Sequence, residues 1–427
     1  MHAIGIDIGT TSICGILLNA ETGEVLRRET VQSNAFLPPS ASFEKIQSVE
    51  KILDVAKGIL DAFITPEVAV IGITGQMHGI VYVDKKGQSI SPLYTWQDGR
   101  GDLPYKDTTY AIHLSTPAGY GCVTDFYNRE NGIRPKEAAY FCTIMDYFAM
   151  HLCGLAAPRM HITNAASLGF FDLLTHSFSY DVGIVPEEGY QIIGTYRGVP
   201  VALPIGDNQA SVFSSLRETG TALLNIGTGS QISVVTEKIL KTENVETRPY
   251  FEGKYLACGA ALCGGRAYSL LKDFFKSVIS PFASPDDGEI YAFMDEMANT
   301  AVSPLSVDTR FAGTRQNPSL SGSISGIRTE NFTPASFTKG ILRGMAEELF
   351  RMQKEMGIPL RGIVGSGNGI RKNEALKKEL EEIFGHPLSV PAHLEEASFG
   401  AALYGLIAAG KYKNASEAGR LIRYEAK

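Results

Sequence analysis

The sequence contains one pattern of strand, glycine turn and strand twice. The first copy, IGIDIGTTSICGILL, spans residues 4–18, and the second, ALLNIGTGSQISVV, spans residues 222–235. Asp7 of the first copy aligns with Asn225 of the second, and Ile-Gly-Thr follows each of them. The second copy begins about halfway along the 427 residues, as a duplicated domain requires. We therefore expect two domains of similar fold.

Each copy has the composition of a phosphate-binding hairpin. Alternating isoleucines place Asp7 on the polar face of its strand, just before the turn at Gly9, Thr10 and Thr11. Glycine lets backbone N–H groups approach an anion closely, and threonine hydroxyls donate further hydrogen bonds. For one copy alone, an ordinary hairpin with a polar tip is the alternative. Two such turns facing each other are suited to hold a polyphosphate from both sides.

Length and composition indicate two domains of a globular, intracellular protein. A chain of 427 residues with 44% hydrophobic content exceeds one ordinary domain, and we place the boundary after residue 217, giving domains 1–217 and 218–427. The net charge of −7 gives no electrostatic basis for binding nucleic acid or an anionic membrane. No apolar run is long enough to span a membrane, and the first residues lead directly into a strand without a signal peptide. Six cysteines without a CxxC pair favour reduced thiols and a cytoplasmic location.

Strands and helices alternate along most of the chain, which predicts an α/β fold. The spacing of apolar residues predicts an amphipathic helix over residues 48–63. Residues 281–331 are rich in Pro, Ser, Gly and Asp, and we interpret them as a long irregular stretch that contains one helix, residues 289–300. The stretch VAVIGITGQ, residues 68–76, reads as a buried strand of a sheet covered on both faces.

Two loops after predicted strands are candidates for binding hydroxyl groups. TGQMHGI, residues 74–80, ends a strand of the parallel type, where open α/β sheets bind ligands, and Gln76 and His78 supply donors and acceptors. TWQDGR, residues 95–100, combines an aromatic face with a carboxylate and a guanidinium, as sugar sites do. The alternatives are a structural histidine, a core tryptophan and a surface salt bridge between Asp98 and Arg100.

Asp207 is the candidate general base. It lies in IGDNQAS, residues 205–211, on a glycine turn between a strand and a helix. A carboxylate there can accept the proton of a substrate hydroxyl, and phosphoryl transfer needs little beyond such a group and charge compensation. Helix capping, a common role of aspartate at this position, is the alternative.

A glycine-rich loop in the second half is a candidate nucleoside site. No GxxxxGK[ST] sequence occurs, so the chain is not a P-loop protein. GSGNG, residues 365–369, follows a strand and precedes a helix, but the acidic residue of a dinucleotide site is missing about 20 residues later. We interpret the loop as a platform for adenine or ribose, with Asn373 able to bond the base.

Taken in order, these motifs resemble the FGGY carbohydrate kinases of the sugar kinase, Hsp70 and actin superfamily. The resemblance covers nearly the whole chain and rests on IGIDIGTTS, TGQMHG, WQDGR, GDNQAS, LNIGTGS and GSGNGIRKNEAL. It implies two RNase H-like (actin-like ATPase) domains with a catalytic cleft between them, ATP and Mg²⁺ as cofactors, and ATP bound mostly by the second domain. GSGNG replaces the more usual three glycines of the family.

The resemblance also implies a role for each residue that matches a family motif. Asp207 is implied as the base, and Asp7 as the residue that holds Mg²⁺ through water. The residues implied to face the sugar are Gln76, Met77, His78, Trp96, Asp98, Arg100 and Asn208. Those implied to contact ATP are Thr10, Thr11, Gly227, Thr228, Gly229, Gly365, Ser366, Gly367 and Asn373.

The implied reaction is ATP-dependent phosphorylation of a ketose. TPAGYGCVTDFY, TNAASLGFFD and TWQDGR are most similar to family members that act on sedoheptulose, so sedoheptulose, giving sedoheptulose 7-phosphate, is the first expectation. A pentulose such as xylulose is the second. An actin-like ATPase or sensor without a sugar substrate is the alternative of a different class, and a homodimer is left open.

Overall fold

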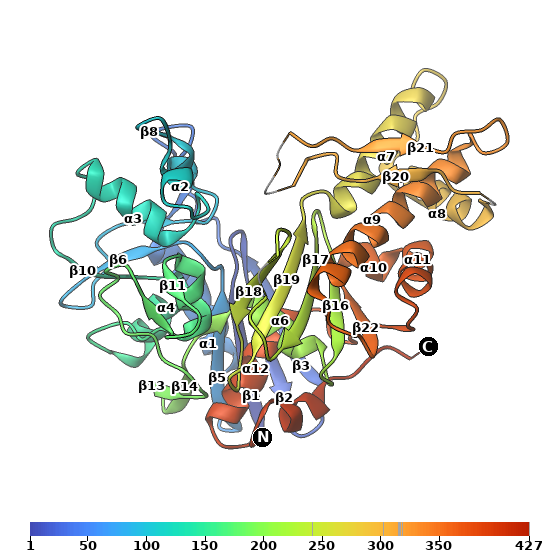
Figure 1. The fold of residues 1–427 in the computed structure, drawn as a ribbon. Helices are drawn as coiled ribbons and strands as arrows, with labels where there is room; N and C mark the ends of the chain where they lie inside the picture. The colour runs from blue at the N-terminus through green and yellow to red at the C-terminus, as the bar shows by residue number, and fades with distance from the viewer. Residues whose placement is uncertain (241, 302, 315–316, 318, 427) are drawn as a thin grey trace. The chain divides into compact units, whose positions relative to one another are not determined.

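The computed structural model describes residues 1–240, 242–301, 303–314, 317 and 319–426, which form two compact units. Unit 1 consists of Met1–Arg217, Arg248–Gly253 and His393–Arg423, and unit 2 of Glu218–Thr247, Lys254–Ala392 and Tyr424–Lys427. The predicted division after residue 217 coincides with the end of the first segment of unit 1, but the sequence did not indicate the later segments that return to it. Each unit contains a mixed sheet flanked by helices (Figure 1).

The sheet of unit 1 has the strand order β13-β14-β5-β1-β2-β3. The strands are β1 (His2–Ile8), β2 (Ser12–Asn19), β3 (Val25–Gln32), β5 (Val68–Gly75), β13 (Ile192–Tyr196) and β14 (Val199–Ala202). β2 is antiparallel to both β1 and β3, whereas β5 runs parallel to β1. The short strand β15 (Ile205–Gly206) pairs in parallel with the end of β5.

Unit 2 repeats the central part of this topology. Its sheet has the order β18-β19-β17-β16-β22-β23, formed by β16 (Thr221–Ile226), β17 (Ser230–Thr236), β18 (Val245–Pro249), β19 (Tyr255–Ala261), β22 (Gly362–Ser366) and β23 (Leu388–Ser389). β17 is antiparallel to β16 and β19, and β22 is parallel to β16. The series β3-β2-β1-β5 and β19-β17-β16-β22 therefore match in order and direction, which confirms the duplication that the hairpins predicted.

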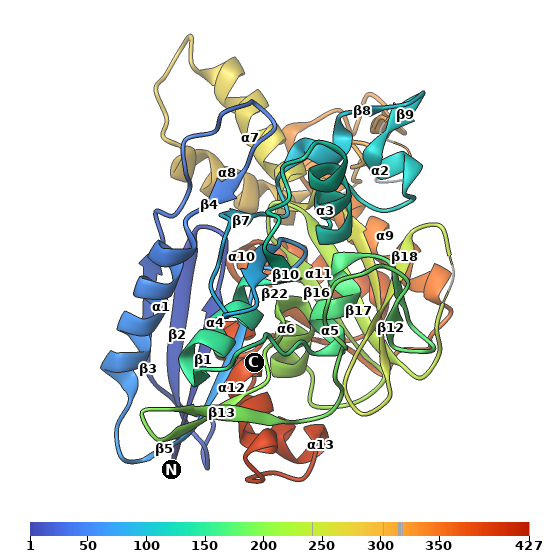
Figure 2. The same cartoon turned by 90° about the vertical axis from the view of Figure 1, so that its left-hand side faces the viewer.

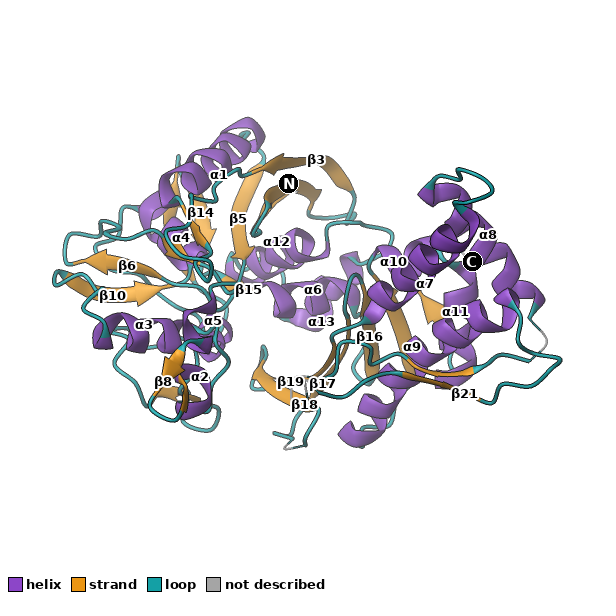
Figure 3. Cartoon of the chain, turned by 90° about the horizontal axis from the view of Figure 1, so that it is seen from above, coloured by secondary structure: helices purple, strands orange, loops and turns teal. Residues whose placement is uncertain are grey.

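Helices cover both faces of the unit 1 sheet. The predicted helix over residues 48–63 is α1 (Val49–Phe63), whose backbone N–H at Lys51 donates to the Ser48 hydroxyl, and it packs against β1 and β2 (Figure 2). On the other face, α6 (Asp207–Ser215) and α12 (Glu396–Ala408) lie side by side (Figure 3). α12 packs on β1 and β5 although almost the whole chain separates it from β1 in sequence (Figure 1).

Glycines allow α12 to approach the sheet and α6 closely. A β-carbon on Gly5 of β1 or on Gly72 of β5 would lie 1.8 Å from a carbonyl oxygen of α12. One on Gly400 of α12 would lie 1.9 Å from the carbonyl oxygen of Ala210 in α6. Backbone atoms cannot yield as the end of a side chain does, so each of these contacts requires glycine.

We expect Gly72→Ala to lower the free energy of unfolding of unit 1 by about 3 kcal/mol, the upper part of the range for over-packing. The physical reason is that the added methyl group must push α12 away from the sheet. Denaturant unfolding measures the change. Gly58→Ala in α1 is the control, because no described atom lies within 4 Å of its β-carbon position and alanine is the better helix former. Equal stability of the two variants would contradict this account of α12.

The described part of unit 2 contains several helices around its sheet. They are α7 (Gly264–Ile279), α8 (Asp287–Thr300), α9 (Pro334–Met356), α10 (Asn368–Lys372) and α11 (Glu374–Phe384). The helix predicted over residues 289–300 is confirmed as α8, which begins two residues earlier because Asp286 and Glu289 form a capping box at its start. Among the described residues, no helix is both long enough and apolar enough to cross a membrane.

Candidate active site

Two carboxylates of unit 1 lie at the ends of β1 and β15, two strands that both pair in parallel with β5. Asp7 is the penultimate residue of β1, and Asp207 follows β15, which pairs with the end of β5. Burial, with the negative charges of Asp207 and Glu395, raises the pKa of Asp7 to about 7. Burial also raises the pKa of Asp207 to about 6, against the opposing effects of the Asn208 N–H and the Arg248 charge. These groups form a concentration of negative charge at the carboxyl edge of the sheet.

Asp207 does not cap the helix that it begins. The N-cap of α6 is Gly206, and no side chain of the described residues caps this helix. The Gly206 N–H donates to the Thr163 hydroxyl at 3.1 Å, which fixes the backbone just before Asp207. Beside it, the Asn208 side chain accepts a hydrogen bond from Arg248. The capping role considered for Asp207 is therefore wrong, and its carboxylate remains a candidate for chemistry.

The tip of the first hairpin is bonded to both predicted sugar loops. The Thr10 hydroxyl accepts from the Trp96 indole N–H at 3.0 Å and donates to the Gln76 amide oxygen at 3.3 Å. Gln47, which sequence reasoning missed, donates to the Thr10 carbonyl at 2.6 Å and accepts from the Gln76 amide at 3.0 Å. Trp96 is 47% exposed, so the alternative of a core tryptophan is wrong. The neighbouring Thr11 side chain is exposed.

His78 is held in a specific orientation. Its φ of 72° is unusual for a residue other than glycine, and its ring stacks on Tyr120 with centroids 4.3 Å apart. The Ser167 hydroxyl accepts from the His78 backbone N–H at 3.2 Å, and the Ser167 carbonyl lies 2.8 Å from Nδ1 of His78. A carbonyl only accepts, so Nδ1 carries a proton and Nε2 of the neutral ring is an acceptor. Met77 is buried.

Asp98 and Arg100 form a buried ion pair. Both side chains are 1% exposed, and the Arg100 guanidinium donates to both Asp98 oxygens, at 2.6 and 3.1 Å. Asp98 also accepts from the backbone N–H groups of Arg100 and Lys45. The guanidinium stacks over the Tyr94 ring at 4.3 Å. The alternative of a surface salt bridge is therefore wrong, and the structure places both side chains inside the loop that presents Trp96.

The ion pair is the start of a longer buried polar network. Arg100 also donates to the amide oxygen of Asn128 in α3 (Gly121–Glu130), and the Asn128 amide donates to the Tyr82 hydroxyl at 3.2 Å. Tyr82 in turn donates to Asp125 at 2.8 Å, and Asp125 pairs with Arg129 at 2.6 Å. The loop of residues 95–100 is thus anchored to α3, a helix outside the motif itself.

Unit 2 contains a cavity of about 940 Å³ beside its own hairpin turn, which we call the polar cavity because charged and polar side chains contribute to its lining. Gly227 and Thr228 line it, and their carbonyl oxygens accept from the N–H groups of Gly265 and Arg266 at the start of α7. Arg266 and Lys372 also line the cavity and supply two cationic side chains. The other described lining residues are Gly265, Tyr268, Ser269, Gly288, Tyr291, Ala292, Asp295, Leu342, Met345, Gly367, Asn368, Gly369, Asn373 and Leu376.

The predicted nucleoside loop meets this cavity only in part. Gly367 and Asn373 line it, whereas Gly365, Ser366 and Gly229 are not among the described lining residues. The Ser366 hydroxyl accepts instead from Asn225, the counterpart of Asp7, at 2.8 Å. The Asn373 side chain caps α11 by accepting from the Leu376 N–H and donates to Asp295.

Sequence reasoning missed the α7 and α8 side of the cavity. Residues 288, 291, 292 and 295 recur at helical spacing and share the face of α8 that lines the cavity. That spacing was visible in the sequence, but nothing in it distinguished a ligand face from an ordinary helix surface.

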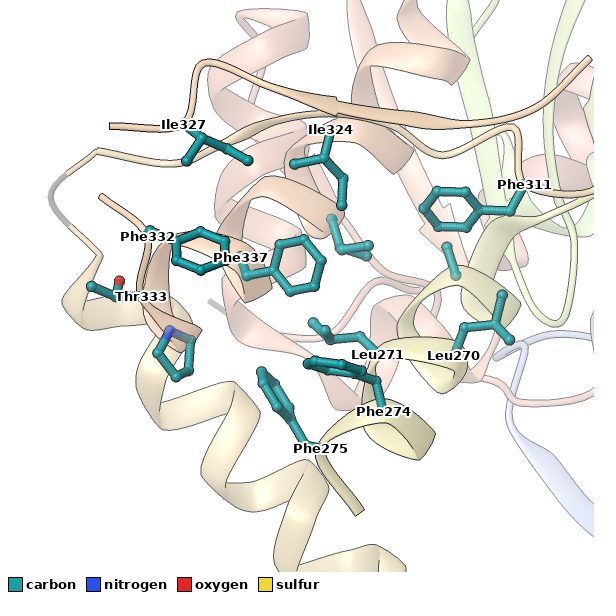
Figure 4. Close-up of a pocket in the computed structure, with 13 residues that line it drawn as sticks. Leu270, Leu271, Phe274, Phe275, Phe311, Ile324, Ile327, Phe332, Thr333 and Phe337 are labelled. Atoms are coloured by element: carbon teal, nitrogen blue, oxygen red, sulfur yellow. The ribbon is translucent and has the colours of Figure 1, made fainter. Parts of the chain in front are cut away.

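A second cavity of unit 2, of about 580 Å³, is apolar (Figure 4). Phenylalanine, leucine and isoleucine side chains line it, and among its described lining residues Thr333 alone has a polar side chain. The Thr333 hydroxyl accepts from the Ser336 N–H at the start of α9. A polyphosphate needs donors and positive charge, so the first of these two cavities is the one suited to a nucleotide.

Comparison with known proteins defines the class first. The structure matches that of a xylulose kinase from Lactobacillus acidophilus with a TM-score of 0.84 and 17% identity, over 100% of this chain and 93% of that one. The duplicated topology is thus the two-domain, actin-like fold of sugar kinases. The chain belongs to the FGGY family of carbohydrate kinases, whose N-terminal domain matches residues 2–104 and whose C-terminal domain matches residues 222–409.

Relatives in sequence cover almost the whole chain. Mouse sedoheptulokinase is 30% identical over 94% of this chain and 96% of its own length. The xylulose kinase of Staphylococcus xylosus is 24% identical over 94% of this chain and 90% of its own length. The predicted sugar phosphotransferase is confirmed at the level of the family, and the family implies ATP as the co-substrate.

Proposed function

We propose that this sugar kinase transfers the γ-phosphate of ATP to sedoheptulose, giving sedoheptulose 7-phosphate. The observation behind this choice is the 30% identity to mouse sedoheptulokinase over 94% of the chain, against 24% to the xylulose kinase over the same share. A pentulose such as xylulose is the second candidate, supported by the sequence similarity to the xylulose kinase of Staphylococcus xylosus.

Asp207 is the proposed general base. A sugar hydroxyl is a poor nucleophile, and a carboxylate within hydrogen-bond reach can both accept its proton and aim its oxygen. The environment of Asp207 supports this role, because burial brings its pKa to about 6, close to the pH at which a base works best. The Thr163 hydroxyl bond to the preceding N–H holds the backbone in place.

The sugar contacts proposed are Gln76, Met77, His78, Trp96 and Asn208. The exposed Trp96 ring suits the C–H face of a sugar, and the His78 ring, held through Nδ1 by the Ser167 carbonyl, would supply a polar contact to a hydroxyl. Asp98 and Arg100 act on the sugar indirectly, by holding the loop that presents Trp96.

ATP is proposed to occupy the polar cavity of unit 2. Gly227 and Thr228, which line the cavity, would contact its phosphates, with Gly229 next to them in the turn, and the charges of Arg266 and Lys372 would assist. Gly367 and Asn373 would lie against the nucleoside, while Gly365 and Ser366 support this loop from the strand below it. Thr10 and Thr11 would contact the transferred phosphate.

The residues around Asp7 fit a magnesium ion. Its carboxylate lies in the field of Asp207 and Glu395, and a cation would offset this repulsion and the cost of burying the charge. The described residues contain no group of three His, Cys, Asp or Glu side chains able to hold a metal. Mg²⁺ needs none, because it is commonly held by one carboxylate, waters and substrate phosphates. When bound, it would supply neutralisation of charge on the phosphates.

The proposal is tested by measuring ADP release with a panel of ketoses that includes sedoheptulose, xylulose and ribulose. We expect the highest kcat/KM with sedoheptulose and no turnover without a sugar. A clearly higher kcat/KM for a pentulose would select the second candidate. Turnover that no sugar stimulates would reject both.

We expect activity and stability to respond to acid in opposite directions. The base must be unprotonated, so kcat/KM should fall as the pH drops below about 6, the pKa of Asp207. Both Asp7 and Asp207 have pKa values raised above the ordinary 3.8, so the folded chain binds their protons more tightly than the unfolded chain does. Their contribution to stability is therefore greatest below about pH 4 and is lost as the pH rises towards about 7. A pH–rate profile and denaturant unfolding at matched pH values measure the two responses. If kcat/KM and the free energy of unfolding both fell as the pH dropped, the loss of activity would reflect acid unfolding instead.

A further inference from the structure

The polar cavity of unit 2 contains a carboxylate that neither the family motifs nor the proposed catalytic steps use. Asp295 lies on α8, on the face formed by Gly288, Tyr291 and Ala292, and lines the cavity with them. A carboxylate would repel the phosphates of a nucleotide. We therefore assign Asp295 to the nucleoside, whereas the cationic side chains of Arg266 and Lys372 suit the phosphates.

Two hydrogen bonds fix the orientation of this carboxylate, and both use the same oxygen. Oδ1 of Asp295 accepts from the Tyr268 hydroxyl at 2.6 Å and from the Asn373 amide at 2.7 Å. Asn373 is itself held by the Leu376 N–H, and the Tyr268 ring lies 5.8 Å from that of Tyr291 and nearly parallel to it. Oδ2 has no hydrogen-bond partner within the described part of the chain. Oδ2 of Asp295 is thus a partly buried acceptor, held in a fixed orientation and able to bond a ligand.

We propose that Oδ2 of Asp295 accepts a hydrogen bond from the nucleoside of the bound nucleotide and thereby selects it. This inference depends on the proposed position of ATP. An ionised carboxylate only accepts, so its partner must be an N–H or O–H donor. In ATP, the donors outside the phosphates are the 6-amino group of adenine and the two ribose hydroxyls. The apolar side chains of Leu342, Met345 and Leu376 in the same lining suit the faces of the base.

The test measures binding of ADP and three analogues by calorimetry, without sugar. The analogues are 2′-deoxy-ADP, 3′-deoxy-ADP and purine riboside diphosphate, each of which lacks one donor. In the wild type we expect one analogue to bind at least about 10-fold more weakly than ADP, since a hydrogen bond to a charged group is lost. That analogue identifies the donor as the amino group or a hydroxyl.

Asp295→Asn should remove this discrimination. The amide is nearly isosteric and its oxygen can still accept from Tyr268 and Asn373, but Nδ2 replaces the acceptor with a donor. We expect ADP to bind at least about 10-fold more weakly to this variant, and the sensitive analogue to bind no worse than ADP. Glu296→Gln, on an exposed neighbour, is the control and should bind ADP as the wild type does. Unfolding temperatures of the three proteins show whether the fold is retained.

The test distinguishes failure of the proposed nucleotide site from failure of the proposed role of Asp295. If the wild type binds no ADP, or if Thr228→Val leaves ADP binding unchanged, the proposed nucleotide site is wrong and this inference fails with it. If the wild type binds ADP and all analogues equally, the site stands and the role of Asp295 is overturned. The same holds if Asp295→Asn retains the wild-type pattern of analogues, because Asp295 would then only orient Asn373.

Discussion

Asp207→Asn is expected to lower kcat at least about 10²-fold, the lower end of what general base catalysis contributes. Asparagine is nearly isosteric with aspartate but cannot accept the proton of the sugar hydroxyl. The loss should appear in kcat, with KM for sugar and ATP changed much less, because the proton moves only in the transition state. Steady-state kinetics with ADP detection measure both constants.

The structure makes this substitution a clean test. α6 is capped by the backbone at Gly206 and by no described side chain, so exchanging the carboxylate for an amide removes no helix cap. Asp146→Asn is the control, because Asp146 is also a buried carboxylate with a raised pKa, but it is bonded to Thr143 and Asn164. This control should keep kcat within about 10-fold, since the proton transfer does not involve it. Near-normal turnover in Asp207→Asn would remove the residue from the chemistry, and the kinase would then use another base.

Arg100→Ala is expected to lower the free energy of unfolding by about 3–5 kcal/mol, the cost of leaving one partner of a buried ion pair alone. The variant would leave the 1% exposed carboxylate of Asp98 without its guanidinium and Asn128 without its donor. Denaturant unfolding of the purified protein measures the change. KM for sugar should also rise in any folded fraction, because the loop that presents Trp96 loses its anchor.

A surface pair provides the matched control. Arg197 donates to Asp61 at 2.7 Å, but its side chain is 55% exposed, so Arg197→Ala should cost less than about 1 kcal/mol. If Arg100→Ala were as stable as this control while KM for sugar rose, Arg100 would be a direct sugar ligand and the present assignment as an anchor would be wrong.

The sequence predicted well what depends on local pattern. The alternation around Asp7 predicted a strand with a polar end, and the apolar spacing over residues 48–63 predicted α1 nearly to the residue. The duplicated hairpins predicted the repeated strand order. Even there a detail differs: Ile8 pairs with Ile13, whereas Ile226 pairs with Ser230, so the second turn is one residue tighter than alignment indicated.

The sequence was less informative where a role depends on distant partners. Arg100 is held by Asp98 of its own motif and also by Asn128 of α3, which the motif TWQDGR does not contain. Gln47 joins the hairpin to Gln76 from a two-residue strand with no recognisable motif. Asp295 lies on a helix that the sequence analysis predicted, but only the packing of α7, α8 and residues 367–373 around one cavity distinguishes it from other surface carboxylates.

The close packing of α12 on β1 and β5, which Gly5 and Gly72 allow, affects the order in which the chain folds during synthesis. The first segment of unit 1 ends at Arg217, and the segment that contains α12 begins only at His393. At about 5 to 20 residues per second, a ribosome needs roughly 10 to 35 seconds to make the intervening chain. During this time Gly5 and Gly72 lack the helix that covers them, and unit 2 can assemble in the interval. Unit 1, whose chain begins first, is therefore still incomplete when most of unit 2 has been translated.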